Sequence, residues 1–346
     1  MSLMEVENIY LQLLYLVSHT HMCQTAVFYG EALARYGFGS FHPLGTDRLG
    51  AFWNKFQSEG IANVVVEEPV LASAQAALSF HDTEYIELVK VASKQGGVLL
   101  DRGDTPAFKG AFEASLFVVG STLAALDMVV AGRDSRKRRV HHAFNPIGGL
   151  HHARRDSAGG FCIFNDIGVA ILAAREKYGI KRIVYIDIDA HHGDGIFYEF
   201  EDDPFLFIAD IHEDGRYLYP GTGSANEIGK GAAAGTKLNI PLQPGAGDDE
   251  FLEGLSKIEQ FVDDVKPELI ILQCGADGLL GDPITHLQYT SNAHKFAANS
   301  LHKLAHKHCN GKIIALGGGG YSKANIGAAW TEVVRSFASE IDSKEE

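Results

Sequence analysis

The chain has 346 residues, 46% of them hydrophobic, and its 44 acidic residues against 30 Lys and Arg give a formal net charge of −14. This length fits one large α/β domain, and the acidic balance argues against a general nucleic-acid binder or a binder of anionic membranes. The four cysteines are far apart and form no Cys-x-x-Cys pair, which is typical of a reducing compartment.

The first 21 residues fit the pattern of the remaining chain poorly. Their apolar run, 9–17, is too short to span a bilayer and lacks the basic flank of a signal peptide. We therefore expect a cytoplasmic protein with no membrane partner. Residues 1–21 are expected to form an N-terminal extension, which is a helix, an oligomer contact or sequence upstream of a start at Met22.

From residue 22 to residue 346, apolar runs alternate with longer amphipathic segments, as in repeated strand–helix units. The expected strands are 25–29, 63–66, 140–144, 183–188, 205–210, 268–273 and 312–316. The expected helices are 48–58, 82–94, 110–131, 166–178, 249–265, 291–308 and 323–338. Because no repeat or linker divides this stretch, the pattern predicts a single-domain, doubly wound, mostly parallel sheet flanked by helices, with its site on one rim.

Adjacent histidines follow the predicted strand 140–144, in the run Gly148-Gly-Leu-His-His-Ala. If a turn splays them, one of His151 and His152 could act as general base and the other as electrostatic partner or general acid. Imidazoles in these roles need carboxylates that fix their tautomer and orientation. An earlier pair, His141-His142, is interpreted as part of the strand and of the surface.

The apolar strand 183–188 leads directly into Asp187, Asp189, His191 and Asp194. Such side chains are costly to bury unless they hold a metal or each other. Asp189 and His191 alternate with apolar residues, so they point to one side of an extended segment and are candidate metal ligands. Asp187 and Asp194 are left to orient the histidine pair. The alternative for Asp189 and His191 is a buried ion pair.

Asp277 is the best candidate for a third ligand, because it follows the buried strand 268–273 and would reach the same rim. Three ligands leave a further position for water, as catalytic sites require. Two carboxylates and one imidazole suit zinc, but they also suit iron(II) or manganese(II). For Asp277 alone, a helix N-cap is the competing interpretation.

A glycine run, Gly317 to Gly320, follows the strand 312–316 and precedes Tyr321. No Lys-Ser/Thr follows it, so a phosphate-binding P-loop is disfavoured. The glycines would let the backbone turn tightly and bring the Tyr321 hydroxyl into the site, where it could stabilise an oxyanion. Simple packing of Tyr321 is the alternative.

Together these motifs resemble the zinc-dependent histone deacetylase superfamily, which has the arginase/deacetylase fold. The resemblance rests on Asp-x-Asp-x-His-His-Gly-Asp-Gly, Gly-Gly-Leu-His-His-Ala, Gly-Phe-Cys-Ile-Phe-Asn-Asp, Tyr-Pro-Gly-Thr-Gly, Gly-Ala-Asp followed by Gly-Asp-Pro, and Gly-Gly-Gly-Gly-Tyr. It runs from about His42-Pro43 to the C-terminal helix. Three further stretches, beginning at Phe144, His212 and Gly281, look like the bacterial acetoin-utilisation-type deacetylases.

The resemblance implies a role for each residue of the rim. Zinc would be held by Asp189, His191 and Asp277, with His151 (backed by Asp187), His152 (backed by Asp194) and Tyr321 as the catalytic groups. Substrate would be bound by Phe161 and Tyr219 as walls of an acyl-lysine tunnel, by Asp104 at its rim, and by Gly160, Ile284, Gly318 and Gly319. Family members usually have Phe at the second wall, so Tyr219 departs mildly from the pattern.

The family also binds potassium, which the resemblance carries over to two places. The inner site would involve Asp187, Asp189, His191, Asp210 and Ile211, and the outer site the backbones of Phe200, Asp203 and Leu206. Many relatives have Ser where Asp210 stands, so this position departs from the family pattern.

The implied function is metal-dependent removal of acetyl or other acyl groups from the ε-amine of lysine, by attack of metal-activated water. The expected partner is an acetylated protein lysine. No nucleic-acid partner is expected, and the chain is compatible with an oligomer. The alternative is an amidohydrolase for small acetylated amines such as acetylputrescine or acetylcadaverine. Ile147-Gly-Gly-Leu in place of Pro-Pro-Gly, and Ile284 in place of an acidic gatekeeper, count against that alternative. A binuclear manganese ureohydrolase and a non-catalytic acyl-lysine reader are disfavoured, because the first needs more aspartates and the second would have lost catalytic residues.

Overall fold

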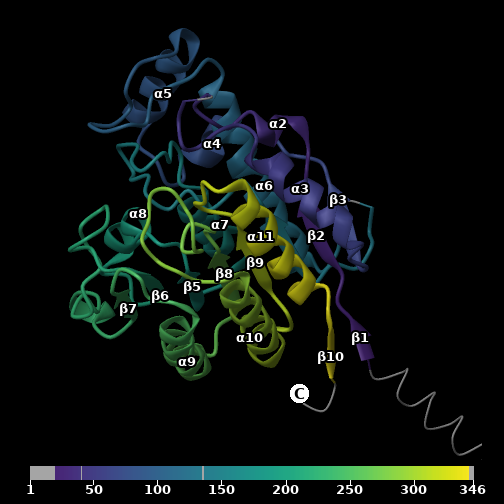
Figure 1. The fold of residues 1–346 in the computed structure, drawn as a ribbon. Helices are drawn as coiled ribbons and strands as arrows, with labels where there is room; N and C mark the ends of the chain where they lie inside the picture. Colours follow the sequence, from purple (N-terminus) through teal and green to yellow (C-terminus); the bar gives the residue numbers. More distant parts are fainter. Residues whose placement is uncertain (1–19, 40, 135, 343–346) are drawn as a thin grey trace, which may run out of the picture.

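An eight-stranded sheet with strand order β3-β2-β4-β9-β8-β5-β6-β7 forms the centre of the computed structural model (Figure 1), which describes residues 20–39, 41–134 and 136–342. All its neighbouring strands pair in parallel. The strands are β2 (Thr25–Phe28), β3 (Val64–Glu67), β4 (His142–Asn145), β5 (Ile183–Asp187), β6 (Leu206–Glu213), β7 (Lys237–Leu242), β8 (Leu269–Gln273) and β9 (Ile313–Leu316). A small antiparallel pair, β1 (Thr20–Met22) with β10 (Glu340–Asp342), lies apart from this sheet.

Helices cover both faces of the sheet. The α-helices are α2 (Glu31–Ala34), α3 (Arg48–Glu59), α4 (Ala74–Ala77), α5 (Thr83–Gln95), α6 (Ala111–Ala131), α7 (Asp166–Tyr178), α8 (Asp194–Phe197), α9 (Asp248–Val265), α10 (Ser291–Cys309) and α11 (Lys323–Phe337). Two short 3₁₀ helices, η1 (Tyr198–Phe200) and η2 (Gly231–Ala233), lie in the connections. One layer packs α9 on α10, α10 on α11 and α11 on α3, and the other packs α5 and α7 on α6. The predicted doubly wound α/β architecture is therefore confirmed.

The central strands are apolar because both of their faces are covered. Every residue of β5, Ile183–Asp187, is buried, as is every residue of β8 and β9. Such strands read as continuous runs of β-branched and aliphatic residues, which is why the sequence reveals them.

Helix α6 is long and apolar enough to cross a membrane by composition, with a hydropathy of 1.9. In the fold, however, 67% of its most apolar window is buried, and it packs against α5, α7 and β4. Its low polarity is that of a core helix, as expected for a helix that is apolar on all sides.

The structure differs from the sequence-based expectations at several places. Strand β7, Lys237–Leu242, was not predicted, because Lys, Asn and Pro interrupt its apolar pattern; it lies at the edge of the sheet, where proline is tolerated. His142 begins β4 as expected, but it is fully buried and does not lie on the surface. Of the predicted N-terminal extension, residues 1–19 lie outside the described residues, and Thr20 and His21 pair with β10.

Candidate metal centre and catalytic site

Four loops converge at the carboxyl ends of the strands, because they follow strands that are neighbours in the sheet. The order β4-β9-β8-β5 places the carboxyl ends of these strands side by side. In parallel sheets this edge is where ligands bind. The loop after β4 carries the histidine pair, and the loops after β5, β8 and β9 carry the acidic cluster, Asp277 and the glycine run.

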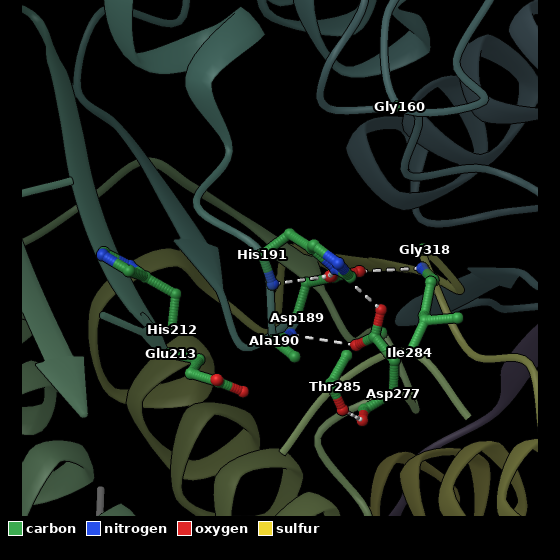
Figure 2. A network of polar contacts seen from close by, with 12 residues as sticks. Gly160, Asp189, Ala190, His191, His212, Glu213, Asp277, Ile284, Thr285 and Gly318 are labelled. Carbon is green, nitrogen blue, oxygen red and sulfur yellow. Dashed lines mark hydrogen bonds and ion pairs between the residues drawn. The ribbon is translucent and has the colours of Figure 1, made fainter. Parts of the chain in front are cut away.

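Asp189, His191 and Asp277 bring their ligand atoms together, all within 4.8 Å of one another, and all three are buried (Figure 2). His191 Nδ1 lies 3.1 Å from Asp189 Oδ1 and 3.1 Å from Asp277 Oδ2. A tetrahedral zinc with N and O ligands at its usual bond lengths separates neighbouring ligand atoms by roughly 3.3–3.6 Å. The donor set therefore fits a small divalent cation after a shift of a few tenths of an ångström.

The electrostatics of these three residues also favour a bound cation. Burial and the charge of Asp189 raise the pKa of Asp277 to about 7, since two carboxylates share one dry space. Burial would lower the pKa of His191, but its bonds to Asp189 and Asp277 outweigh burial and raise it to about 10. A bound dication relieves both of these conflicts by replacing the proton.

The second oxygen of each carboxylate is held by the surrounding protein. Asp189 Oδ2 accepts bonds from Gln273 Nε2 (2.7 Å) and from the Gly319 amide (2.8 Å), and Asp277 Oδ1 accepts one from the Ala190 amide (2.9 Å). A Cβ at position 319 would lie 2.2 Å from Asp277 Oδ2. The glycine run thus lets the backbone close over the ligand carboxylates, and only a residue without a side chain fits there.

Each catalytic histidine candidate has its own carboxylate. His151 Nδ1 lies 2.8 Å from Asp187 Oδ2, and His152 Nδ1 lies 2.7 Å from Asp194 Oδ1. Arg154 donates to the second oxygen of Asp194 at 2.8 Å. Because a carboxylate only accepts, Nδ1 of each ring carries the proton and Nε2 is directed to other partners.

The two imidazoles differ in charge. Burial and the neighbouring His151 lower the pKa of His152 to about 4. Burial also opposes protonation of His151, but the carboxylates of Asp187 and Asp189 outweigh it and raise its pKa to about 9. When two neighbouring groups have such different pKa values, one is neutral and can accept a proton while the other is charged. Here His152 is the neutral ring and His151 the charged one.

Tyr321 lies beside the metal trio, on the loop that Arg48 holds in place. Buried Arg48 donates from Nε to the Gly320 carbonyl (2.9 Å) and from its terminal nitrogen to the Gly318 carbonyl (2.5 Å). Burial and the charges of Asp277 and Asp189 raise the pKa of Tyr321 well above its usual value. The hydroxyl therefore stays protonated and can donate a hydrogen bond.

Aromatic rings flank the approach to this centre. The Phe161 ring contacts Tyr321 edge-on at 5.8 Å between centroids, and Phe161 is buried with a φ of 67°. Tyr219 is 52% exposed, and its ring lies 5.1 Å from that of His152 and 6.4 Å from that of His191. The two predicted tunnel walls thus line different sides of the site, with Tyr219 reaching the solvent.

The other predicted substrate residues lie around these walls. Gly160 packs flat on His152, since a Cβ there would lie 2.2 Å from His152 Cδ2. Ile284 is half-buried, and its amide donates to Asp282 (3.2 Å) in the loop that follows Asp277. Figure 2 shows Ile284 close to Asp277, with Gly160 farther away on a loop above the metal trio. Asp104 is exposed, and its carbonyl accepts from His42 at 2.9 Å.

Of the predicted inner potassium residues, Asp187 and Asp210 pair on the adjacent strands β5 and β6. The Asp210 carboxylate receives the Gly193 amide (2.9 Å) and lies 2.6 Å from His212 Nδ1. At the predicted outer site, the Lys237 ammonium donates to the carbonyls of Leu206 (2.5 Å) and Asp203 (3.0 Å). A protein cation therefore already contacts two of the three carbonyls expected to bind the second potassium.

Sequence reasoning missed the residues that hold the loops. Besides Arg48 and Gln273, buried Asp166 accepts the amides of Gly149 and Leu150 and so fixes the turn before the histidines. Asp166 belongs to the motif Gly-Phe-Cys-Ile-Phe-Asn-Asp, which was the available signal for it. Arg48 begins an ordinary amphipathic helix, and nothing in its local pattern distinguishes it from a surface arginine.

Residues 42–337 match the family model described as the histone deacetylase domain. The acetoin utilization protein AcuC of Bacillus subtilis is 38% identical over 327 residues, which cover 92% of this chain and 81% of that protein. AcuC of Staphylococcus aureus is 32% identical over 334 residues, with 92% and 82% covered. A protein of Archaeoglobus fulgidus named probable deacetylase is 34% identical over 308 residues, with 86% and 81% covered.

Among solved structures, the HD domain of HDA15 superimposes with a TM-score of 0.82 at 25% identity, over 92% of this chain and 89% of that one. The likeness extends over most of both chains. The predicted arginase/deacetylase fold is confirmed by it.

Proposed function

This chain belongs to the histone deacetylase family, and from that membership we propose that it removes acetyl groups from the ε-amine of lysine side chains by metal-activated attack of water. The observation that supports this most is the convergence of the metal trio with a carboxylate-backed histidine pair and a protonated tyrosine. Amide hydrolysis needs these groups together: an electrophile for the carbonyl, a base for water and a donor for the oxyanion.

A metal held by Asp189, His191 and Asp277 would supply a Lewis acid that acidifies water and polarises the acetamide carbonyl. Zinc suits this ligand set best, with iron(II) as the alternative. His152, neutral because its pKa is lowered to about 4, takes the proton of the attacking water on Nε2 while Asp194 holds Nδ1. His151 stays protonated and stabilises the developing negative charge. The proton on His152 then passes to the departing amine.

Tyr321→Phe is expected to lower kcat by on the order of 10²–10³-fold, the loss typical of removing one oxyanion donor. The ring and its contact with Phe161 remain, so KM and metal content should change little. Steady-state kinetics on an acetyl-lysine peptide, with metal analysis of the same sample, measure both. Near-normal turnover would remove Tyr321 from the mechanism.

The lysine substrate, rather than a free polyamine, is proposed because Ile284 offers no carboxylate to a second amine. Asp104, exposed at the predicted rim, is the residue proposed to bind the substrate backbone. Phe161 and Tyr219 would enclose the apolar chain of the side chain between them.

The experiment that tests this function compares kcat/KM on acetyl-lysine peptides, acetylputrescine, acetylcadaverine and acetylspermidine, with zinc and with iron(II). We expect the peptides to be preferred and a chelator to stop turnover. Tyr321→Phe serves as the low-activity control for contaminating hydrolases. A preference for free acetyl-diamines of roughly 100-fold, about 2.7 kcal/mol in the barrier, would overturn the lysine assignment.

For potassium we propose one ion, at the inner position between Asp187 and Asp210, as the structural partner of the metal centre. At the outer position we propose that the Lys237 ammonium replaces the second ion, since it already binds the carbonyls of Asp203 and Leu206. A cytoplasmic location is proposed as well; Cys23, Cys162, Cys274 and Cys309 form no disulfide.

A further inference from the structure

A second group of metal-ligating side chains lies at the amino ends of the strands, opposite the catalytic site at their carboxyl ends. Cys23 precedes β2, His142 is the first residue of β4, and His302 and His306 lie one helical turn apart on α10. One ligand atom from each of the four comes within 4.8 Å of those of the other three. Cys23, His142 and His302 are buried, and His306 is partly buried.

The imidazole nitrogens point into this group. His142 Nδ1 lies 2.8 Å from the Gly311 carbonyl, which can only accept, so Nδ1 carries the proton and Nε2 keeps its lone pair. His142 Nε2 lies 3.3 Å from His306 Nε2, which in turn lies 3.4 Å from Cys23 Sγ. His302 Nε2 is buried without a hydrogen-bond partner.

The two distances from His306 Nε2 are close to those of a small tetrahedral metal site. With Zn–N bonds of about 2.0–2.1 Å and a Zn–S bond of about 2.3 Å, neighbouring nitrogens lie roughly 3.3–3.4 Å apart and nitrogen and sulfur roughly 3.6 Å apart. Hydrogen bonding alone would explain the contacts of His306, but it leaves His302 Nε2 buried and unsatisfied, which is unfavourable. A metal at the centre satisfies all four ligand atoms at once.

Burial keeps two of the histidines, His142 and His302, in the neutral form that binds metals. Burial lowers the pKa of His142 well below its usual value and that of His302 to about 3, so both rings are neutral. The Phe337 ring packs 5.4 Å from His142 and 6.1 Å from His302, which shields the group from water. A thiol that coordinates a metal loses its proton on binding.

We propose that Cys23, His142, His302 and His306 form a structural zinc site that fastens the segment before β2 to β4 and α10. Four protein ligands leave no open position, which is the arrangement of structural and not of catalytic zinc. A mixed thiolate and imidazole set favours zinc over magnesium, calcium or manganese. This site is independent of the proposed hydrolysis and would exist whatever the substrate is.

Metal analysis of the full-length, reduced protein after equilibration with Zn²⁺ and gel filtration tests the proposal. We expect two equivalents of zinc in the unaltered chain, one in Cys23→Ser, one in the catalytic-site variant Asp277→Asn, and none in the double variant. A single equivalent in the unaltered chain that Asp277→Asn alone removes would overturn the proposal.

Cobalt(II) separates the two sites spectroscopically. Because the catalytic trio contains no sulfur, a thiolate-to-cobalt charge-transfer band can come only from Cys23 among the residues proposed here as ligands. The band should persist in Asp277→Asn and disappear in Cys23→Ser and in His302→Gln, with circular dichroism showing that both variants are folded. Cys309→Ser and His308→Gln, on the same helix but outside the group, are matched controls that should keep it. Absence of the band in the unaltered protein, or its survival in Cys23→Ser, would contradict the site.

Discussion

Asp277→Asn is expected to abolish stoichiometric metal binding at the catalytic edge and to lower kcat/KM by on the order of 10⁴-fold or more. Asparagine keeps the shape of the side chain but removes a negative charge, so the neutral amide binds a dication far less well. Without the metal the reaction loses several kcal/mol of transition-state stabilisation, and each 1.4 kcal/mol is about tenfold in rate.

The measurement pairs zinc content with kcat/KM on an acetyl-lysine peptide. Asp263→Asn is the matched control, because its carboxylate bonds Lys307 and His308 away from the site. Full zinc content at the catalytic edge and normal turnover in Asp277→Asn would show that Asp277 binds no metal.

His152→Gln should lower kcat by about 10²–10⁴-fold, the usual contribution of a general base, while the metal content stays at its normal level. The ring is the neutral one of the pair and its Nε2 is the acceptor that water would use. His151→Gln is expected to lose less, because it removes a stabilising charge and leaves proton transfer in place.

Comparing the two variants by kcat, with metal content measured on each, tests this division of roles. A larger loss in His151→Gln than in His152→Gln would reverse the assignment. Loss of metal in either variant would instead show that the histidines help to hold the ion.

Much of the fold is readable from the sequence because its central strands are buried on both faces. The runs that became β5, β8 and β9 are unbroken and apolar, and the helices between them have clear amphipathic patterns. Strand β7 is not readable, since an edge strand needs only partial burial and tolerates Pro241. Its existence depends on pairing with β6, which is a tertiary property.

The residues of the candidate site also fall into those that the sequence predicts and those that only tertiary contacts reveal. Asp189, His191 and Asp277 are found from sequence because each follows a strand, and a sheet brings the ends of neighbouring strands together. Arg48 acts through two carbonyls of a loop about 270 residues away in the chain, and no local pattern encodes that contact. His142 was misplaced on the surface for a related reason: its partners come from α10 and from the segment before β2.

The position of β2 sets a limit on how this protein can be shortened. The family match begins at residue 42, yet β2, Thr25–Phe28, lies second from one end of the sheet, directly between β3 and β4. Among the described residues β3 pairs only with β2, so a fragment cut at the start of the match would leave β3 unpaired. It would also open the backbone donors and acceptors of β4 to foreign chains. The folding unit is thus longer at its start than the family match, and fragments for biophysical work should retain β2.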